Sequence, residues 1–170
     1  MKIELLESKD IPKEIADTGL SDLSKIYVVA QHMEKICLDK KGVGLSAVQV
    51  GIPWKFFIYL DENSNKFKYM INCNYEPIGE EKYLSIEGCL SIFDFNGNLK
   101  RFKLMRDHKV KITGKQLILE NNELKLVDFE EIFEKGFTAT VFQHEIDHQN
   151  GILISDIGEE IQIHNCYNLG

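Results

Sequence analysis

The chain has 170 residues, of which 44% are hydrophobic and 28% charged, as expected for a globular protein with its own core. The formal net charge of −7 gives no indication of nucleic-acid binding. No segment reaches the roughly 20 apolar residues of a membrane-spanning helix, and the start resembles neither a signal nor a transit peptide. We therefore expect one domain over residues 1–170, located in the cytoplasm, or in an organelle if a precursor segment is missing.

The first predicted element is an amphipathic helix near the N-terminus. Ser21 and Asp22 are typical of a helix N-cap. The apolar residues that follow recur at intervals of three and four: Leu23, Ile26, Ala30, Met33 and Cys37. This pattern predicts a helix to about Lys40, ended by Gly42-Val43-Gly44, which leads into an irregular loop.

The middle of the chain has the patterns of β-strands. The apolar run 56–60, bounded by the polar turn 61–66, predicts a buried strand. Val110 and Ile112 alternate with lysines, which predicts another strand. Asn96-Gly97 is a typical hairpin turn, and Asn121-Asn122 between the apolar runs 117–119 and 124–127 predicts a second hairpin.

A second helix is predicted from about residue 134. Ala139, Phe142 and Ile146 share one helical face, and Asn150-Gly151 is a typical helix stop. Ile152–Ile154 resembles one more short strand. The expected fold class is α+β, with antiparallel strands packed around this central C-terminal helix and the amphipathic helix near the N-terminus.

The second helix contains an H-E-x-x-H motif, His144-Glu145-Ile146-Asp147-His148. Residues i and i+4 lie on one helix face, so both imidazoles can bind one metal ion at about 2.0–2.1 Å. Glu145 can reach a water on the metal as a general base. Asp147 is either a solvated carboxylate or an acceptor for a ligating histidine. An isolated motif of this kind also fits two surface histidines on a solvated helix.

Two histidines leave a catalytic metal short of a third protein ligand, for which the other histidines, the carboxylates and four cysteines are candidates. Cys89 stands out because its neighbour Gly88 allows close backbone approach. Cys37 lies on the apolar helix face, where a thiol normally belongs to the core. Cys73 and Cys166 have no comparable setting, and without a secretory signal we expect free thiols. A Cys–His–His set leaves one metal position open, as in catalytic sites.

Three motifs, in this order, resemble those of the peptide deformylase family. The chain has G-V-G-L-S-A-V-Q at 42–49, E-G-C-L-S at 87–91 and Q-H-E-I-D-H at 143–148, where the family has G-x-G-L-A-A-x-Q, E-G-C-L-S and Q-H-E-x-D-H. The resemblance implies a metal-dependent hydrolase. Its members remove the formyl group from the N-terminal formyl-methionine of newly made polypeptides and release formate, by attack of a metal-bound hydroxide.

The resemblance also implies a ligand set. Cys89, His144 and His148 would hold one divalent ion, with Fe²⁺ favoured and Zn²⁺, Ni²⁺ or Co²⁺ also accepted by such donors. Glu145 would take a proton from the water and deliver it to the leaving amine. Glu87 would be paired with a downstream arginine, for which Arg106 is the best match and Arg101 the competitor.

Further residues take substrate roles by the same resemblance. The side-chain amide of Gln49 and the backbone N–H of Leu90 would donate to the oxyanion, where a carboxylate at position 49 would repel it. Gly44 would pair with the peptide in strand fashion. The methionine side chain would enter an apolar pocket near Val43, Leu45, Val141 and His144.

The chain departs from the family pattern in three places. Ser46 replaces the usual alanine, and the segment 92–105 is longer than in the family, so peptide preference beyond methionine is not carried over. Glu159-Glu160 and few basic residues follow the second helix, so ribosome docking is not carried over either. The expected partner is a formyl-methionyl nascent peptide, with no direct nucleic-acid or membrane partner.

Two alternatives compete with the deformylase hypothesis. The first is a metallopeptidase of the H-E-x-x-H type, which lacks a downstream ligand at the usual spacing and leaves Cys89 and Gln49 unexplained. The second is a non-catalytic relative that binds formylated or methionine-led peptides. Release of formate from a formyl peptide distinguishes the main hypothesis from both.

Overall fold

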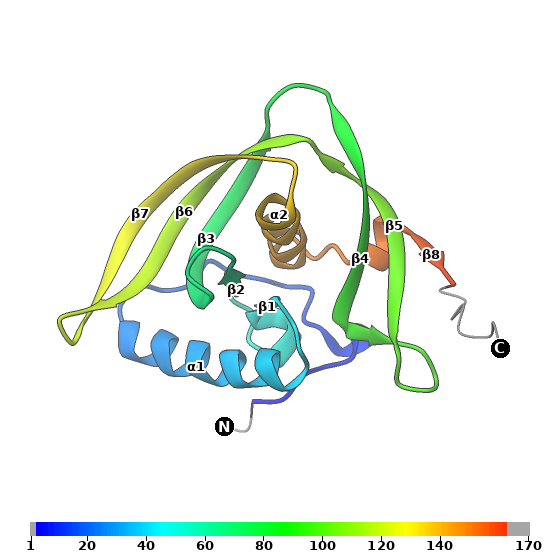
Figure 1. Ribbon diagram of the computed structural model, residues 1–170. Coiled ribbons are helices and arrows are strands. Elements are labelled where there is room, and N and C mark those ends of the chain that lie inside the picture. The colour runs from blue at the N-terminus through cyan, green and yellow to red at the C-terminus, as the bar shows by residue number, and fades with distance from the viewer. Residues whose placement is uncertain (1–2, 163–170) are drawn as a thin grey trace.

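A five-stranded antiparallel sheet forms the larger half of the computed structural model, which describes residues 3–162 (Figure 1). Its order is β1-β2-β3-β6-β7. The strands are β1 (Gly44–Ser46), β2 (Phe56–Asp61), β3 (Lys66–Pro77), β6 (Lys109–Glu120) and β7 (Glu123–Glu134). Asn121 and Asn122 both have positive φ values, 52° and 63°, as a two-residue hairpin turn requires. The hairpin predicted there is confirmed.

A smaller antiparallel sheet has the order β4-β5-β8. Its strands are β4 (Lys82–Phe93), β5 (Leu99–Asp107) and β8 (Glu159–Ile161). The Asp94 carboxylate accepts the backbone N–H groups of Asn96 and Asn98, both at 2.8 Å, and so closes the predicted hairpin at Gly97. Residues 78–81 and His108 connect the two sheets at one end. The sheets diverge from that end (Figure 1).

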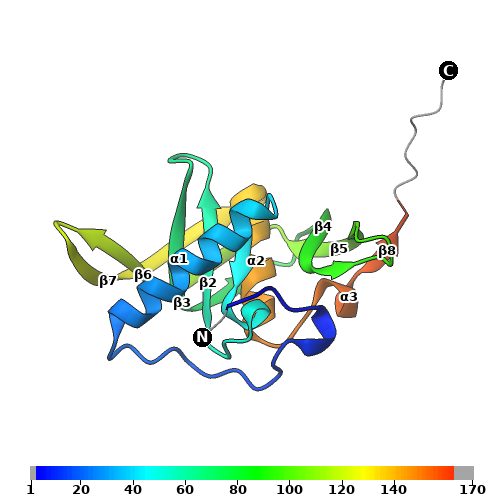
Figure 2. The same ribbon diagram turned by 90° about the horizontal axis from the view of Figure 1, so that it is seen from below.

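Two helices pack against these sheets. The Asp22 side chain caps α1 (Leu23–Asp39) by accepting the Lys25 N–H at 3.0 Å, as the sequence predicts. α2 (Phe137–Gln149) lies between the two sheets, whereas α1 crosses the opposite face of the five-stranded sheet (Figures 1 and 2). The expected α+β class with strands around a central helix is confirmed.

The structure corrects three local expectations. The strand predicted at Ile152–Ile154 is wrong: the chain enters a short helix, α3 (Ile154–Ile157), which Asp156 caps by accepting the Leu153 N–H at 2.8 Å. The irregular loop predicted after the first helix is also wrong from Gly44 onward, because β1 pairs there with β2. α2 begins later than residue 134 because β7 continues to that position. Two 3-10 turns complete the order, η1 (Ser8–Asp10) and η2 (Ala47–Val50).

Strand β2 explains how the core is layered. Phe56 and Ile58 pack with α1, whereas the alternate residues Phe57 and Tyr59 pack with α2. Both faces of the strand are therefore buried, which accounts for its unbroken apolar run. A third apolar cluster lies under the smaller sheet and consists of Cys89, Ile92, Phe102, Leu104 and Ile154.

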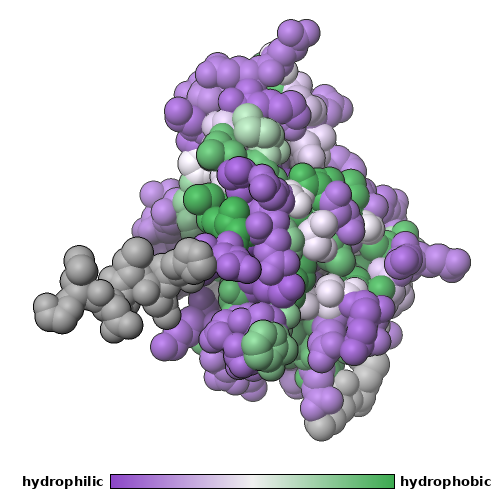
Figure 3. All heavy atoms as spheres, turned by 90° about the vertical axis from the view of Figure 1, so that its right-hand side faces the viewer, coloured by the Kyte–Doolittle hydropathy of each residue, from purple (hydrophilic) through white to green (hydrophobic). Residues whose placement is uncertain are grey.

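The outer face of the smaller sheet is partly apolar. Leu84, Ile86 and Met105 are each more than half exposed, and Figure 3, which views this side, shows apolar patches among hydrophilic side chains. No helix within residues 3–162 is long and apolar enough to cross a membrane. Among the described cysteines, Cys37, Cys73 and Cys89 are buried free thiols, and Cys166 lies outside the described residues.

Candidate metal centre

The two motif histidines lie one turn apart on the buried helix α2. Their Nε2 atoms are 3.2 Å apart, and both point toward β4. His148 is 2% exposed, and burial lowers its pKa well below the ordinary value. An imidazole that stays neutral is the form that ligates a metal.

Strand β4 brings Cys89 to the same point. Its Sγ lies 3.4 Å from His148 Nε2, and the three donor atoms all lie within 4.8 Å of one another. Because side chains alternate along a strand, four consecutive inward positions of β4 are polar or ionisable and buried. They are Ser85, Glu87, Cys89 and Ser91.

The three donors fit one divalent metal ion. Ligands at about 2.0–2.3 Å in tetrahedral geometry lie about 3.3–3.6 Å from one another, close to the 3.2 Å and 3.4 Å that separate His148 Nε2 from the other two donors. Burial opposes protonation of His144, yet the neighbouring Cys89 and Glu87 raise its pKa to about 10. The ionised Glu87 carboxylate beside His144 therefore favours a positive charge at this position. Of the residues described, no other group of His, Cys, Asp or Glu converges in this way.

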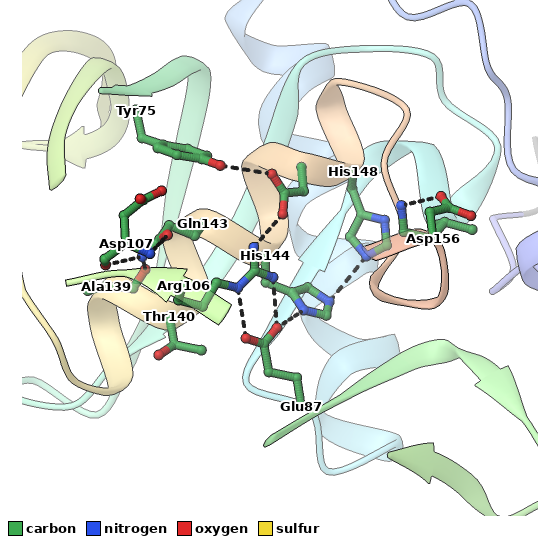
Figure 4. Close-up of polar contacts among 12 residues, drawn as sticks. Tyr75, Glu87, Arg106, Asp107, Ala139, Thr140, Gln143, His144, His148 and Asp156 are labelled. Atoms are coloured by element: carbon green, nitrogen blue, oxygen red, sulfur yellow. Dashed lines mark hydrogen bonds and ion pairs between the residues drawn. The ribbon is translucent and has the colours of Figure 1, made fainter. Parts of the chain in front are cut away.

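A buried ion-pair network contacts the Nδ1 side of the His144 ring (Figure 4). The Nδ1 atom of His144 lies 2.8 Å from Glu87 Oε2, and Arg106 donates two hydrogen bonds of 2.8 Å to the same carboxylate. Burial alone would raise the pKa of Glu87, but the bonds from Arg106 and His144 lower it to about 2. Glu87 is therefore ionised and orients the imidazole, as carboxylates do behind many metal-binding histidines.

Asp147 extends this network rather than binding a histidine or facing solvent, the two alternatives that the sequence left open. Its carboxylate is buried, pairs with Arg106 and accepts the Tyr75 hydroxyl at 3.2 Å. Arg101, the alternative partner of Glu87, is exposed on the other face of β5. The sequence did not point to Tyr75, which comes from the distant strand β3.

Glu145 lies at the floor of the site with its carboxylate buried. It is 4% exposed, and its Oε2 atom forms no hydrogen bond. Burial raises the pKa of this carboxyl to about 7. The group can therefore both accept and release a proton near neutral pH.

Gln49 is held in one orientation beside the donors. Its Oε1 accepts the Ser46 N–H at 2.9 Å, so its Nε2 points to Cys89 Sγ at 3.4 Å and to Ser91 Oγ at 3.1 Å. The hydroxyl added at Ser46 finds a partner in the Phe56 carbonyl. Ser91 was not singled out from the sequence, although it lies two positions after Cys89 on the same strand face.

A pocket of about 620 Å³ opens beside the donors. Val43, Gly44, Leu90 and Val141 line it together with His144 and Glu145. Leu45, which we expected at this pocket, does not line it, because its side chain points the other way and is fully buried in the core against α1. The alternation of β1 thus puts Gly44 at the pocket and Leu45 in the core.

Comparison with known proteins identifies the family. The model of the family described as polypeptide deformylase matches residues 5–162. A peptide deformylase of Helicobacter hepaticus is 35% identical over 159 residues, covering 89% of this chain and 77% of the relative. One of Campylobacter jejuni is 33% identical over 136 residues, covering 76% of this chain and 70% of the relative.

A solved structure has the same fold. The class I type b peptide deformylase of Acinetobacter baumannii, in its Met-Ala-Ser-bound crystal structure, is 27% identical and superposes with a TM-score of 0.73. The match covers 92% of this chain and 98% of the other.

Proposed function

This chain belongs to the polypeptide deformylase family, hydrolases that remove the formyl group from nascent peptides, and from that premise we propose its site and substrate. The substrate is an N-terminal formyl-methionyl peptide, and the place of action is the cytoplasm. The ligands of one divalent metal ion are Cys89, His144 and His148. The observation that carries the proposal is the convergence of these three donors with Glu145 and Gln49 at one pocket.

A divalent ion held by Cys89, His144 and His148 would supply a Lewis acid and would lower the pKa of the attacking water. Glu145 accepts the proton of the attacking water and delivers it to the amine of methionine as the formyl C–N bond breaks. Its raised pKa, about 7, suits both transfers. The products are formate and a free N-terminus, so the protons balance.

The oxygen of the formyl group gains negative charge as its carbon becomes tetrahedral. The Nε2 group of Gln49 and the backbone N–H of Leu90 are the chain's own donors to it. Gln49 is suited to this role because its amide is already oriented by Ser46 and Ser91. Donors fixed before the reaction need no reorganisation during it.

The methionine side chain enters the pocket between Val43 and Val141. Gly44 lies at the edge strand β1, where its backbone can pair with an extended peptide. The Met-Ala-Ser bound in the Acinetobacter structure is a peptide that begins with methionine, which supports this choice of substrate. We propose Fe²⁺ as the metal. Thiolate and imidazole donors also accept Zn²⁺, Ni²⁺ or Co²⁺.

The test is an assay of purified protein loaded with Fe²⁺ without oxygen, which protects the thiolate site. We expect formyl-Met-Ala-Ser to yield equal amounts of formate and free amine. Glu145→Gln should keep its metal but lose activity by a factor of about 10²–10⁴. Cleavage of an internal peptide bond without formate would indicate a metallopeptidase, and binding without turnover a non-catalytic relative; either result rejects the proposal.

A further inference from the structure

Three exposed cations surround the pocket of a chain whose net charge is −7. Lys40 and Lys41 line one side of the pocket at the end of α1, and Arg101 lines it from β5. The acidic residues that line it, Glu87 and Glu145, are both buried, and no exposed acidic residue contributes to the lining. The accessible part of the pocket is therefore positive although the molecule is acidic.

Arg101 lies opposite Gly88 in the β4–β5 register, and both residues line the pocket. A Cβ at Gly88 would lie 3.0 Å from Arg101 Nη1 and 2.3 Å from Leu99 Cδ2. The absence of a side chain at Gly88 thus makes room for the guanidinium to lie across β4. Arg106 already satisfies Glu87, so Arg101 is left without a carboxylate partner among residues 3–162.

Lys41 is placed by an unusual backbone conformation. Its φ is 55°, in the left-handed region, where a residue just after a helix is most often glycine. A lysine is disfavoured there, because its Cβ crowds the following carbonyl oxygen, and the chain has glycine only at the next position, Gly42. Neither Lys40 nor Lys41 forms an ion pair with any described residue. The two lysines follow α1, whose end lies close to β4 (Figures 1 and 2), and Arg101 lines the same pocket from β5.

We propose that these three cations, the cationic rim, make the enzyme select formyl-methionyl peptides with acidic side chains directly after methionine. The inference rests on the proposed function, because it assumes that the peptide lies in this pocket. A peptide held there by its methionine lies in the pocket that the cationic rim lines. Acidic side chains would pair with the rim, and basic side chains would be repelled by it.

The expected size of the effect follows from the exposure of the rim. A solvent-exposed ion pair changes an equilibrium constant by a factor of about 1.4 to 5. Two or three such pairs should favour acidic over basic peptides by about five- to twenty-fold at low salt. At 1 M salt the screening length falls to about 3 Å, so the preference should disappear.

The experiment compares kcat/KM for the C-terminally amidated peptides formyl-Met-Glu-Glu, formyl-Met-Gln-Gln and formyl-Met-Lys-Lys, with the Fe²⁺ enzyme at low and high salt. Amidation removes the terminal carboxylate, which would otherwise be a second anion. We expect the order Glu, Gln, Lys at low salt. In the triple variant Lys40→Gln, Lys41→Gln, Arg101→Gln, the ratio of the acidic to the basic peptide should fall to about one.

A matched control removes the same charge elsewhere. Lys13, Lys35 and Lys66 are exposed, do not line the pocket and have no ion pair within the described chain. The variant with glutamine at all three positions should keep the preference for acidic over basic peptides. Loss of that preference would show that net charge, not the cationic rim, determines it, and would overturn the inference.

The two proposals fail in different ways. Turnover of all three peptides at equal kcat/KM overturns the cationic rim and leaves the deformylase function standing. If no peptide is turned over, the function is wrong. Calorimetric binding of the unformylated amides Met-Glu-Glu and Met-Lys-Lys then still decides the inference: tighter binding of the acidic peptide supports it, and equal binding rejects it.

Discussion

The backbone of Gly44 lies directly against the carboxylate of Glu145. A Cβ at Gly44 would stand 2.5 Å from Oε1 and 3.1 Å from Cδ of that side chain, and 3.2 Å from Val141 Cγ1. Glu145 cannot swing away freely, because it is 4% exposed within the packed helix α2. The edge strand β1 and the helix can therefore approach this closely only because position 44 has no side chain.

Gly44→Ala should consequently displace the carboxylate of Glu145, the proposed general base. A shift of about 1 Å at a reacting group can lower the rate about 10²-fold. We therefore expect kcat/KM for formyl-Met-Ala-Ser to fall by about 10- to 100-fold. Metal content should be unchanged. Gly19→Ala is the control, since nothing lies within 4 Å of its Cβ position. Full activity of Gly44→Ala would mean that Glu145 is not the group whose position limits the reaction.

Cys89→Ala should lose the metal. Removing one of three protein ligands leaves two imidazoles, so we expect metal content after dialysis, measured by mass spectrometry, to fall at least about tenfold. Cys73→Ala is the matched control, because Cys73 is also a buried free thiol but does not belong to the group of converging donors. If Cys89→Ala retains a full equivalent of metal, the third ligand is another residue.

Gln49→Glu tests the oxyanion donor with little change of shape. The new side chain keeps an oxygen for the Ser46 N–H but replaces the N–H₂ group that points to Cys89 and Ser91. Loss of one such donor should lower kcat about 10²–10³-fold, with added repulsion between the carboxylate and the oxyanion. Gln49→Leu lacks that repulsion, so it should be the more active of the two. The reverse order would exclude Gln49 as an oxyanion donor.

Arg106→Met should destabilise the fold itself. It leaves the carboxylates of Glu87 and Asp147 buried without their cation, which typically costs about 3–5 kcal/mol. Urea unfolding of the metal-free protein measures this without the contribution of the ion. Lys109→Met breaks the exposed pair with Glu134 and should cost less than about 1 kcal/mol. Equal effects of the two variants would show that the buried network does not stabilise the fold.

The local patterns of the sequence were sufficient for most elements. The helix after Asp22, the turn at Asn121-Asn122 and the histidine helix depend on contacts within a few residues, which periodicity and capping report directly. The strand expected at Ile152–Ile154 is wrong because three consecutive apolar residues do not distinguish a strand from a short helix. The cap provided by Asp156 decides that case.

What the sequence determined by itself about the site is the pair His144 and His148, since i,i+4 spacing on a helix fixes their relation without any tertiary contact. The resemblance of the three ordered motifs to those of the deformylase family predicted Cys89 as the third metal ligand. Cys89 and His148 are 59 positions apart along the chain, and only the tertiary structure brings Cys89 Sγ to 3.4 Å from His148 Nε2.

Strand alternation decided the remaining questions. On β5, Phe102, Leu104 and Arg106 face inward and Arg101 faces outward, so Arg106 and not Arg101 reaches Glu87. On β1 the same alternation sends Leu45 to the core and leaves Gly44 at the pocket. Which face of a strand is the inner one depends on what packs against it, and that is set by the assembled sheets, not by the strand's own residues.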